Sequence, residues 1–236
     1  MSRLRGGLQD PLLSVVMPVY NEAATVEEII RRVLAVPIRI QLIVVDDGST
    51  DGTRDRLQEL QGKVGFTLLL QPRNQGKGAA LRRGFQEVRG DLVVIQDGDL
   101  EYSPEELPML IELICQGRAD VVYGSRFLGR HRVFLFSHYL GNRLLTLVTN
   151  VLYNTMLTDM ETCYKVMRTE VVRSLTLRSN GFGVEPELTA KIFKRGYRVY
   201  EVPITYDGRG YEEGKKIGWR DGVVALWVLL RYRFSE

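Results

Sequence analysis

The sequence predicts an α/β fold in which helices flank a mostly parallel, doubly wound sheet. Strand-like apolar runs alternate with helix-like amphipathic stretches through the first half of the chain, as they do in βαβ units. Polar clusters follow three of the strand-like runs. The chain has 236 residues, 44% of them hydrophobic, which is enough for one full α/β core. We expect one main domain over residues 12–206, a flexible N-terminus over 1–11, a mobile loop over 207–216 and an amphipathic helix within 217–236.

The first half supplies the repeating units of this fold. Strands are expected at short apolar runs bounded by turn residues, at 12–19, 40–45, 66–70, 91–96 and 121–123. Helices are expected where apolar residues recur with helical periodicity, at 22–36, 51–61 and 78–88. A fourth helix is expected after Ser103, which suits an N-cap, with Pro104 at the first position and Glu106 completing a capping box.

The second half of the chain is less regular. Residues 137–153 and 186–195 have helical periodicity, and residues 198–205 resemble a strand. Residues 207–216 combine glycines with basic residues, a composition typical of a mobile loop. The last helix is expected at 219–234, where a continuous apolar run lies between arginines.

Charge and cysteine content exclude some classes of protein. The formal net charge of +3 is too small to indicate a nucleic-acid-binding protein. Cys115 and Cys163 lack the spacing of a metal site, so reduced thiols in a cytoplasmic protein are the simpler interpretation. No apolar stretch approaches the roughly 20 residues that a membrane-spanning helix needs. The first residues show no secretory signal pattern.

Two aspartates one residue apart, Asp97 and Asp99, carry the strongest functional signal. They follow the strand expected at 91–96, and open α/β sheets bind ligands at the carboxyl ends of such strands. Gly98 between them permits a turn and the close approach of a ligand. Two hard carboxylates suit Mg²⁺ or Mn²⁺ holding a diphosphate. The alternative is a solvated Asp-Gly-Asp turn.

Two more polar clusters, at 17–22 and 46–51, follow the first two expected strands. An acidic residue such as Asp46 at a strand end can bind a ribose hydroxyl or a base amide, although capping of the next helix is the alternative. Lys77 precedes the third expected helix and is placed to meet an anion. Three clusters on one edge of the sheet predict a nucleotide-binding crevice.

In these segments the chain resembles family 2 glycosyltransferases of the GT-A fold, in particular the dolichyl- and polyprenyl-phosphate mannose or glucose synthases. The matching segments occur in family order at 16–22, 44–51, 74–80, 96–101 and 123–126, with weaker similarity at 158–165 and 185–191. The resemblance implies a metal-dependent, inverting enzyme. Such an enzyme transfers a hexose from a nucleotide-sugar, GDP-mannose or UDP-glucose, to a polyprenyl phosphate.

The resemblance also implies roles by position. The residues implied to act in catalysis are Asp99 and Arg126. Those implied to bind the nucleotide-sugar are Pro18, Tyr20, Glu22, Asp46, Asp47, Lys77, Asp97 and Gly98. Those implied to hold Mg²⁺ or Mn²⁺ are Asp97, Asp99 and Glu101, the last at a position where relatives often carry glutamine. The cations implied to bind the acceptor phosphate are Arg126, Arg132, Arg143, Lys215 and Lys216.

The nature of the acceptor leaves alternatives open. A lipid phosphate is already an anionic nucleophile, so its reaction needs cations more than a strong base. A soluble acceptor would instead need a base, for which Glu185 and Asp159 are the candidates, and a non-catalytic nucleotide-sugar-binding subunit is a third interpretation. A polyprenyl phosphate also implies peripheral contact with the cytoplasmic face of a membrane, through the helices expected at 137–153 and 219–234. The alternative is that both helices complete the soluble core.

Overall fold

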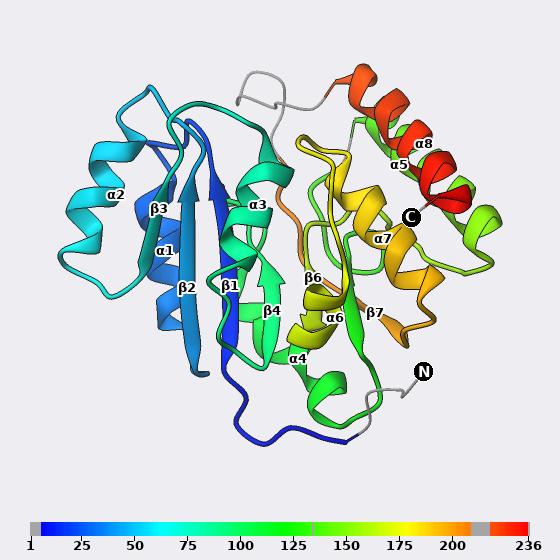
Figure 1. The fold of residues 1–236 in the computed structure, drawn as a ribbon, viewed down its shortest axis with the longest axis horizontal. Coiled ribbons are helices and arrows are strands. Elements are labelled where there is room, and N and C mark those ends of the chain that lie inside the picture. Colours follow the sequence, from blue (N-terminus) through cyan, green and yellow to red (C-terminus); the bar gives the residue numbers. More distant parts are fainter. Residues whose placement is uncertain (1–5, 134, 209–217, 236) are drawn as a thin grey trace.

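The computed structural model describes residues 6–133, 135–208 and 218–235 of the chain, and Figure 1 shows its arrangement. A seven-stranded sheet in the order β3-β2-β1-β4-β6-β5-β7 runs through the molecule. The strands are β1 Leu13–Val19, β2 Ile40–Asp46, β3 Thr67–Leu70, β4 Leu92–Ile95, β5 Val121–Ser125, β6 Lys165–Arg168 and β7 Val199–Pro203. The helices are α1 Val26–Ala35, α2 Thr53–Gln61, α3 Lys77–Phe85, the 3-10 turn η1 Pro104–Glu106, α4 Leu107–Cys115, α5 Phe136–Tyr153, α6 Thr169–Ser174, α7 Val184–Lys194 and α8 Trp219–Phe234.

The register of the central strands brings the predicted polar clusters to one edge. β1 pairs in parallel with β2, with Val19 opposite Asp46, and in parallel with β4, with Val16 opposite Ile95. The carboxyl ends of all three strands therefore meet at the same edge of the sheet. These strands are rich in valine, isoleucine and leucine because helices cover both of their faces. In Figure 1, α3 and α6 lie on one face and α1 and α4 on the other. The predicted mostly parallel, doubly wound sheet is confirmed.

Strand β6 and helix α6 were not predicted. β6 runs antiparallel to β4 and β5 and lies between them. It has four residues, with Lys165 and Arg168 at its ends, and so offers neither a long apolar run nor a clear alternation. Its antiparallel direction matters for the site, because the residues that precede β6 lie at the edge where β4 and β5 end.

The predicted capping box at Ser103 is wrong. Ser103 makes no side-chain capping hydrogen bond, and the segment begins with the 3-10 turn η1 before α4. The Glu106 carboxylate instead accepts hydrogen bonds from the backbone N–H and the hydroxyl of Thr205, both at 2.9 Å. Glu106 therefore fixes the chain that follows β7 rather than the start of its own helix.

Both ends of the described chain are tied to the body of the protein. Residues 6–8 belong to the segment expected to be flexible, yet Leu8 donates a backbone hydrogen bond to Cys115 and Arg168 donates one to the Gly6 carbonyl. At the other end, the Tyr153 hydroxyl of α5 donates to the Leu229 carbonyl of α8 at 2.7 Å. The two helices lie side by side in Figure 1.

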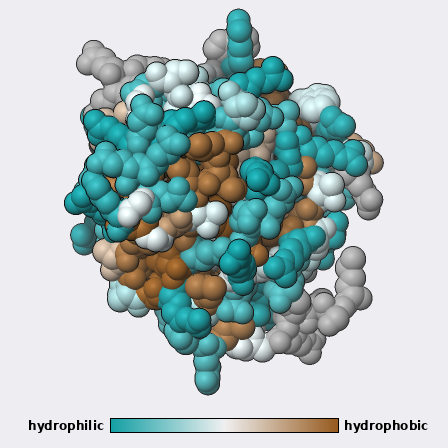
Figure 2. All heavy atoms as spheres, turned by 60° about the vertical axis from the view of Figure 1, so that its left-hand side comes forward, coloured by the Kyte–Doolittle hydropathy of each residue, from teal (hydrophilic) through white to brown (hydrophobic). Residues whose placement is uncertain are grey.

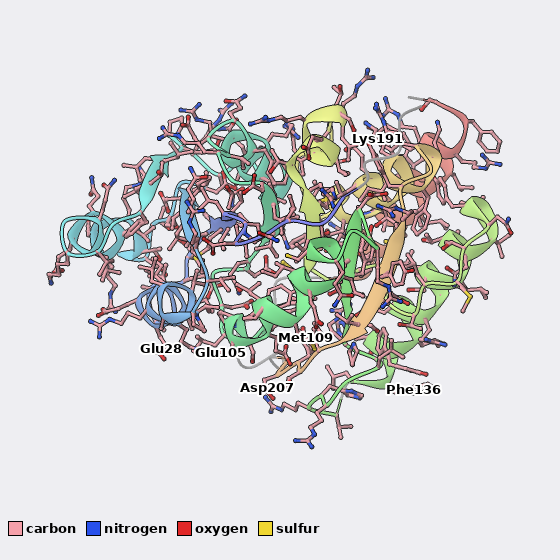
Figure 3. The ribbon with its side chains drawn as sticks, turned by 90° about the horizontal axis from the view of Figure 1, so that it is seen from below. Glu28, Glu105, Met109, Phe136, Lys191 and Asp207 are labelled. Carbon is pink, nitrogen blue, oxygen red and sulfur yellow. The ribbon has the colours of Figure 1, made fainter. Side chains whose placement is uncertain are left out.

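Helix α7 lies beneath α8 and anchors it. The ammonium group of Lys191 lies 4.3 Å from the centre of the Tyr232 ring, and Figure 3 shows Lys191 near the crossing of the two helices. Within the described residues, no helix is both long enough and apolar enough to cross a bilayer.

Candidate active site

A cavity of about 920 Å³ opens at the edge of the sheet where β1, β2, β4 and β5 end. Its size is that of a site for a large ligand. The segment before β6 and helices α5, α7 and α8 also contribute to its wall. The predicted site residues that line it are Pro18, Tyr20, Glu22, Asp47, Lys77, Asp97, Gly98, Asp99, Glu101 and Arg126.

The loops after β1 and β2 are bonded to each other and form one end of the cavity. Asn21 has a positive φ of 53°, a conformation that asparagine tolerates better than most residues. The Asn21 side chain accepts a hydrogen bond from the Thr50 N–H at 2.9 Å, and the Glu22 N–H donates to the Thr53 hydroxyl at 2.9 Å. These hydrogen bonds hold Tyr20 and Glu22 in place on the cavity wall.

The two consecutive aspartates at the end of β2 have different surroundings. Asp46 is fully buried and forms an ion pair with Arg54 of α2, with an N–O distance of 2.6 Å. It does not line the cavity. Asp47 does line the cavity, and its carboxylate accepts hydrogen bonds from the N–H groups of Gln75 and Gly76, both at 2.8 Å. Burial raises the pKa of Asp47, against the opposing effect of these hydrogen bonds.

The loop held by Asp47 positions Lys77 at the start of α3. Gly76 has a φ of +96°, and a Cβ there would lie 2.5 Å from the Asn180 carbonyl oxygen, so the loop requires glycine. The Lys77 ammonium lies 2.7 Å from Asp97 Oδ1 and 3.3 Å from Glu185 Oε1. Burial opposes the charged form of Lys77, but Asp97, Cys163 and Glu185 together raise the lysine pKa well above its ordinary value.

Asp97, Gly98 and Asp99 form the middle of the cavity wall, directly after β4. A Cβ on Gly98 would lie 3.1 Å from the Val19 side chain, so the close approach of β1 favours glycine there. Asp99 Oδ1 accepts a hydrogen bond from the Glu101 N–H at 3.1 Å. The Glu101 carboxylate accepts one from the Tyr206 hydroxyl at 2.5 Å.

Asp97 and Asp99 fit a divalent cation that also binds a diphosphate. Mg²⁺ in such sites is typically held by one or two carboxylates, with phosphate oxygens and water as the other ligands. Among the residues that the structure describes, no group of three or more His, Cys, Asp or Glu side chains forms a metal cluster on its own.

Arg126 follows β5 and is held by a buried carboxylate. Its Nε donates to Asp159 Oδ2 at 2.7 Å and its Nη2 to Asp159 Oδ1 at 2.8 Å. The guanidinium also lies 5.2 Å from the centre of the Tyr206 ring. Burial disfavours the charged form, but the carboxylate of Asp159 raises the pKa of Arg126 well above its ordinary value. Arg126 is thus a fixed cation that faces the cavity.

Both alternative bases are engaged in ion pairs. Asp159 holds Arg126 with both of its oxygens, while Glu185 pairs with Lys165 at 2.6 Å and lies near Lys77. Both carboxylates are thus already engaged with buried cations. The arrangement therefore gives no support to either residue as the base of a soluble-acceptor enzyme.

Glu161 is a cavity residue that the sequence reasoning did not identify. Its side chain lines the cavity, and its Oε1 is buried without a hydrogen-bond partner among the described residues. Burial raises the pKa of Glu161 to about 7, although the charge of Lys165 acts in the opposite direction. The weak sequence similarity at 158–165 was the available signal, but without a predicted β6 nothing placed Glu161 at the sheet edge.

Two of the four other cations predicted to bind the acceptor phosphate lie outside the cavity wall. Arg132 and Arg143 are exposed and do not line the cavity. Arg132 donates its backbone N–H to the Tyr206 carbonyl, and the Arg143 guanidinium donates to the Thr158 carbonyl at 3.3 Å. Lys215 and Lys216, with most of the predicted loop, lie outside the described residues.

Helices α5 and α8 line the cavity mainly with apolar residues, together with Ser137, His138, Asn142 and Asp221. The apolar residues include Leu144, Leu145 and Val148 of α5, and Val223 and Leu226 of α8. The polar strand ends and these apolar residues therefore share one continuous space.

Residues 14–176 match the model of the family described as glycosyl transferase family 2. The chain belongs to this family. The family resemblance inferred from the sequence motifs is thus confirmed.

Two relatives illustrate the range of proteins that the chain is similar to. The dolichol-phosphate mannosyltransferase of Pyrococcus furiosus is 32% identical over 87% of this chain and 59% of its own length. The dodecaprenyl-phosphate galacturonate synthase of Rhizobium johnstonii is 29% identical over 89% of this chain and 64% of its own. The chain thus spans less than two thirds of the length of these relatives.

Solved structures of the same fold confirm the predicted GT-A architecture. Glucosyl-3-phosphoglycerate synthase from Mycobacterium tuberculosis, crystallised with Mn²⁺, UDP and phosphoglyceric acid, superposes with a TM-score of 0.75. The match covers 95% of this chain and 79% of that one, at 24% sequence identity. At this level of identity the likeness establishes the fold.

Proposed function

We propose that the protein is a metal-dependent, inverting glycosyltransferase that moves a hexose from a nucleotide-sugar to a polyprenyl phosphate. The observation that carries this proposal is the continuity of the cavity. It runs from the acidic end of β4 past Arg126 to the apolar residues of α5 and α8. A polyprenyl phosphate has the same two parts, an anionic head and an apolar chain. The names of the relatives from Pyrococcus and Rhizobium point to the same class of acceptor.

The donor would occupy the other end of the cavity. Pro18, Tyr20 and Glu22 would contact the nucleoside, and Lys77 would meet the diphosphate next to Asp97 and Asp99. A Mg²⁺ or Mn²⁺ held by these aspartates would neutralise charge on the departing nucleoside diphosphate. The solved glucosyl-3-phosphoglycerate synthase contains Mn²⁺ and UDP, which agrees with this arrangement.

The reaction requires no general base. An oxygen of the lipid phosphate attacks the anomeric carbon, while the bond from that carbon to the diphosphate breaks and the nucleoside diphosphate leaves. Arg126 would offset the repulsion between the two phosphates, since a guanidinium fits phosphate geometry and keeps its charge. The engagement of Asp159 and Glu185 in ion pairs supports a reaction of this kind.

We also propose that α5 and α8 lie on a membrane surface. The exposed large apolar side chains of α5 recur on one face, at Phe136, Leu140, Leu144, Leu147 and Val151. Those of α8 are Val223, Val224, Leu226, Trp227, Leu230 and Phe234. An apolar stripe of this kind next to arginines is typical of interfacial helices. The side that carries α2 and β3 is mainly hydrophilic, with separate hydrophobic patches, as Figure 2 shows.

Transfer of labelled hexose from a nucleotide-sugar into the lipid phase tests the proposed function. Labelled GDP-mannose and UDP-glucose are incubated with Mn²⁺ and either a short-chain polyprenyl phosphate or the matching polyprenol. We expect label in the lipid phase only with the phosphorylated lipid and with one of the donors. Asp97→Ala should abolish this transfer, whereas Asp55→Asn on the exposed face of α2 should leave it unchanged. Transfer to 3-phosphoglycerate but not to the lipid would contradict the proposed acceptor.

A further inference from the structure

Glu161 lies on the cavity wall but takes no part in the proposed reaction. Its carboxylate lines the cavity, and Oε1 is shielded from solvent without a hydrogen-bond partner among the described residues. A buried carboxylate oxygen without a partner is costly, because its lost hydration is not replaced. Such a group is unusual in a folded protein and calls for an explanation, of which an absent ligand is one.

The local structure holds Glu161 at one point of the sheet edge. The next residue, Thr162, donates its hydroxyl to the Gly124 carbonyl of β5 at 2.6 Å. The backbone N–H of Cys163 donates to the Tyr102 hydroxyl at 3.0 Å, and its thiol lies 3.6 Å from the Ile95 carbonyl of β4. Glu161 is therefore fixed between the ends of β4 and β5, rather than on a loop that is free to turn away.

The order of the strands indicates which part of a bound nucleotide-sugar would lie next to Glu161. Along the edge, the nucleoside residues follow β1, the diphosphate and metal residues follow β4, and Arg126 follows β5. A nucleotide-sugar laid along this edge places its hexose beyond the diphosphate, next to the ends of β4 and β5. Glu161 lies at that point.

The chemistry of the surroundings restricts what Glu161 can bind. A carboxylate repels phosphate, and the nearby cations Lys165 and Arg126 are already paired with Glu185 and Asp159, so the surroundings of Glu161 carry no excess charge of either sign that would attract an ion. A neutral hydroxyl group remains, since it can donate a hydrogen bond to the carboxylate. The hexose is the part of the donor that carries several such hydroxyls near the reacting carbon.

On the basis of the proposed function, we infer that Glu161 binds a hydroxyl group of the donor hexose and thereby helps to select the sugar. Buried groups that bind a substrate hydroxyl discriminate strongly against an analogue that lacks it or places it differently. Glu161 is then a specificity residue for the sugar, separate from the groups that hold the nucleotide and the metal.

The test compares each nucleotide with its sugar conjugate. Dissociation constants for UDP, GDP, UDP-glucose and GDP-mannose are measured calorimetrically with Mn²⁺, on the full chain and on Glu161→Ala, Glu161→Gln and the exposed control Glu170→Gln. We expect Glu161→Ala to weaken binding of the sugar conjugate about tenfold relative to its nucleotide. Glu161→Gln, which retains an oxygen acceptor and the side-chain volume, should show a smaller loss, and the control none.

Several outcomes would overturn the inference. An unchanged ratio of the two constants in both variants would show that Glu161 does not contact the sugar, and an equal loss for nucleotide and conjugate would show a structural role. A fall in kcat with an unchanged ratio would place the residue on the acceptor side. In each of these cases the wild-type protein still binds a nucleotide-sugar, so the donor proposed for the reaction stands. If the wild-type protein binds none of the four probes, the proposed donor and this inference fail together.

Discussion

At the scale of single residues, the site depends on carboxylates that hold cations in place. Arg126 is fixed by both oxygens of Asp159, which is itself fully buried. Lys77 lies between Asp97 and Glu185, and Glu185 also holds Lys165. Arg126 and Lys77 therefore each face the cavity in one orientation, which is how preorganised electrostatic stabilisation arises.

The first prediction concerns Asp159. Asp159→Asn removes the charge that balances a buried guanidinium, so we expect the free energy of unfolding to fall by about 3–5 kcal/mol. Lipid-phosphate transfer should fall with it, since Arg126 loses its fixed orientation. Urea unfolding and initial rates measure the two effects. The matched control is Glu105→Gln, which breaks the exposed pair with Arg32 and should cost about 0–1 kcal/mol. Similar costs for the two variants would contradict the assigned role of Asp159.

The second prediction is a dependence of stability on pH. Burial raises the pKa of Glu161 to about 7 from an ordinary value of 4.5, so between these two values the folded protein binds more protons than the unfolded chain. Stability is therefore lost as the pH rises through this range. Glu161→Gln should unfold like the wild-type protein near pH 4.5. Near pH 8 it should be more stable by about 1–3 kcal/mol.

Denaturant midpoints at the two pH values measure this effect. Because Lys165, Glu185, Arg126 and Asp159 also act on Glu161, the comparison must be made between variants rather than from the pH profile of one protein. If the stability of Glu161→Gln depends on pH as that of the wild-type protein does, folding does not raise the pKa of the Glu161 carboxyl group.

At the scale of elements, α5 and α8 present apolar side chains that the core does not use. Trp227 is 55% exposed and Leu147 is 58% exposed, while the Tyr153 hydroxyl bonds the two helices to each other. Figure 3 shows Phe136 at the outer end of α5. The pair forms one surface rather than two independent helices.

The third prediction tests this surface. We expect the variant with Leu147→Ser and Trp227→Ser to bind anionic vesicles about tenfold more weakly, because it buries less apolar area in the membrane. Co-sedimentation with vesicles of phosphatidylglycerol and phosphatidylcholine measures the binding. Leu70→Ser is the control, since Leu70 is 44% exposed on β3, at the far edge of the sheet. Equal binding by the wild-type protein, the double variant and Leu70→Ser would show that the apolar faces of α5 and α8 do not bind the membrane.

The elements also show what the sequence alone could predict. Three of the parallel strands, β1, β2 and β4, were predictable because each is an apolar run followed by a polar cluster, as at β4 and Asp97. β6 was not, because four residues with charged ends gain their strand conformation from pairing with β4 and β5. Glu161 was missed as a result. The partner of Arg126 was missed for a similar reason, since Asp159 is 33 residues away and only the tertiary fold brings it near.

At the scale of the whole molecule, the cavity joins most parts of the fold. β1, β2, β4, β5, the segment before β6, and helices α5, α7 and α8 all contribute to its wall. A ligand that fills the donor end would therefore contact parts of the chain that are far apart in sequence.

The fourth prediction follows from this arrangement. A nucleotide-sugar at one hundred times its dissociation constant should stabilise the protein by about 2.7 kcal/mol. For a chain of this length that corresponds to a rise in Tm of about 5–10 °C. The rise should need Mn²⁺ and disappear with EDTA, because Asp97 and Asp99 repel a diphosphate that lacks its cation. Thermal unfolding with nucleotide-sugar alone, Mn²⁺ alone and both together measures it. A rise in Tm that persists in the presence of EDTA would contradict a role for the metal in binding the nucleotide-sugar.

The direction of β6 has one more consequence. Each parallel strand reaches the active edge with the residues that follow it, whereas β6 reaches that edge with the residues that precede it. The side chain at position 161 can therefore vary without altering the loops that hold the nucleotide and the metal, whereas Asp159 and Cys163 of the same segment hold Arg126 and Tyr102. If Glu161 selects the sugar, natural variation at position 161 would let one scaffold serve many donors while the diphosphate chemistry stays the same.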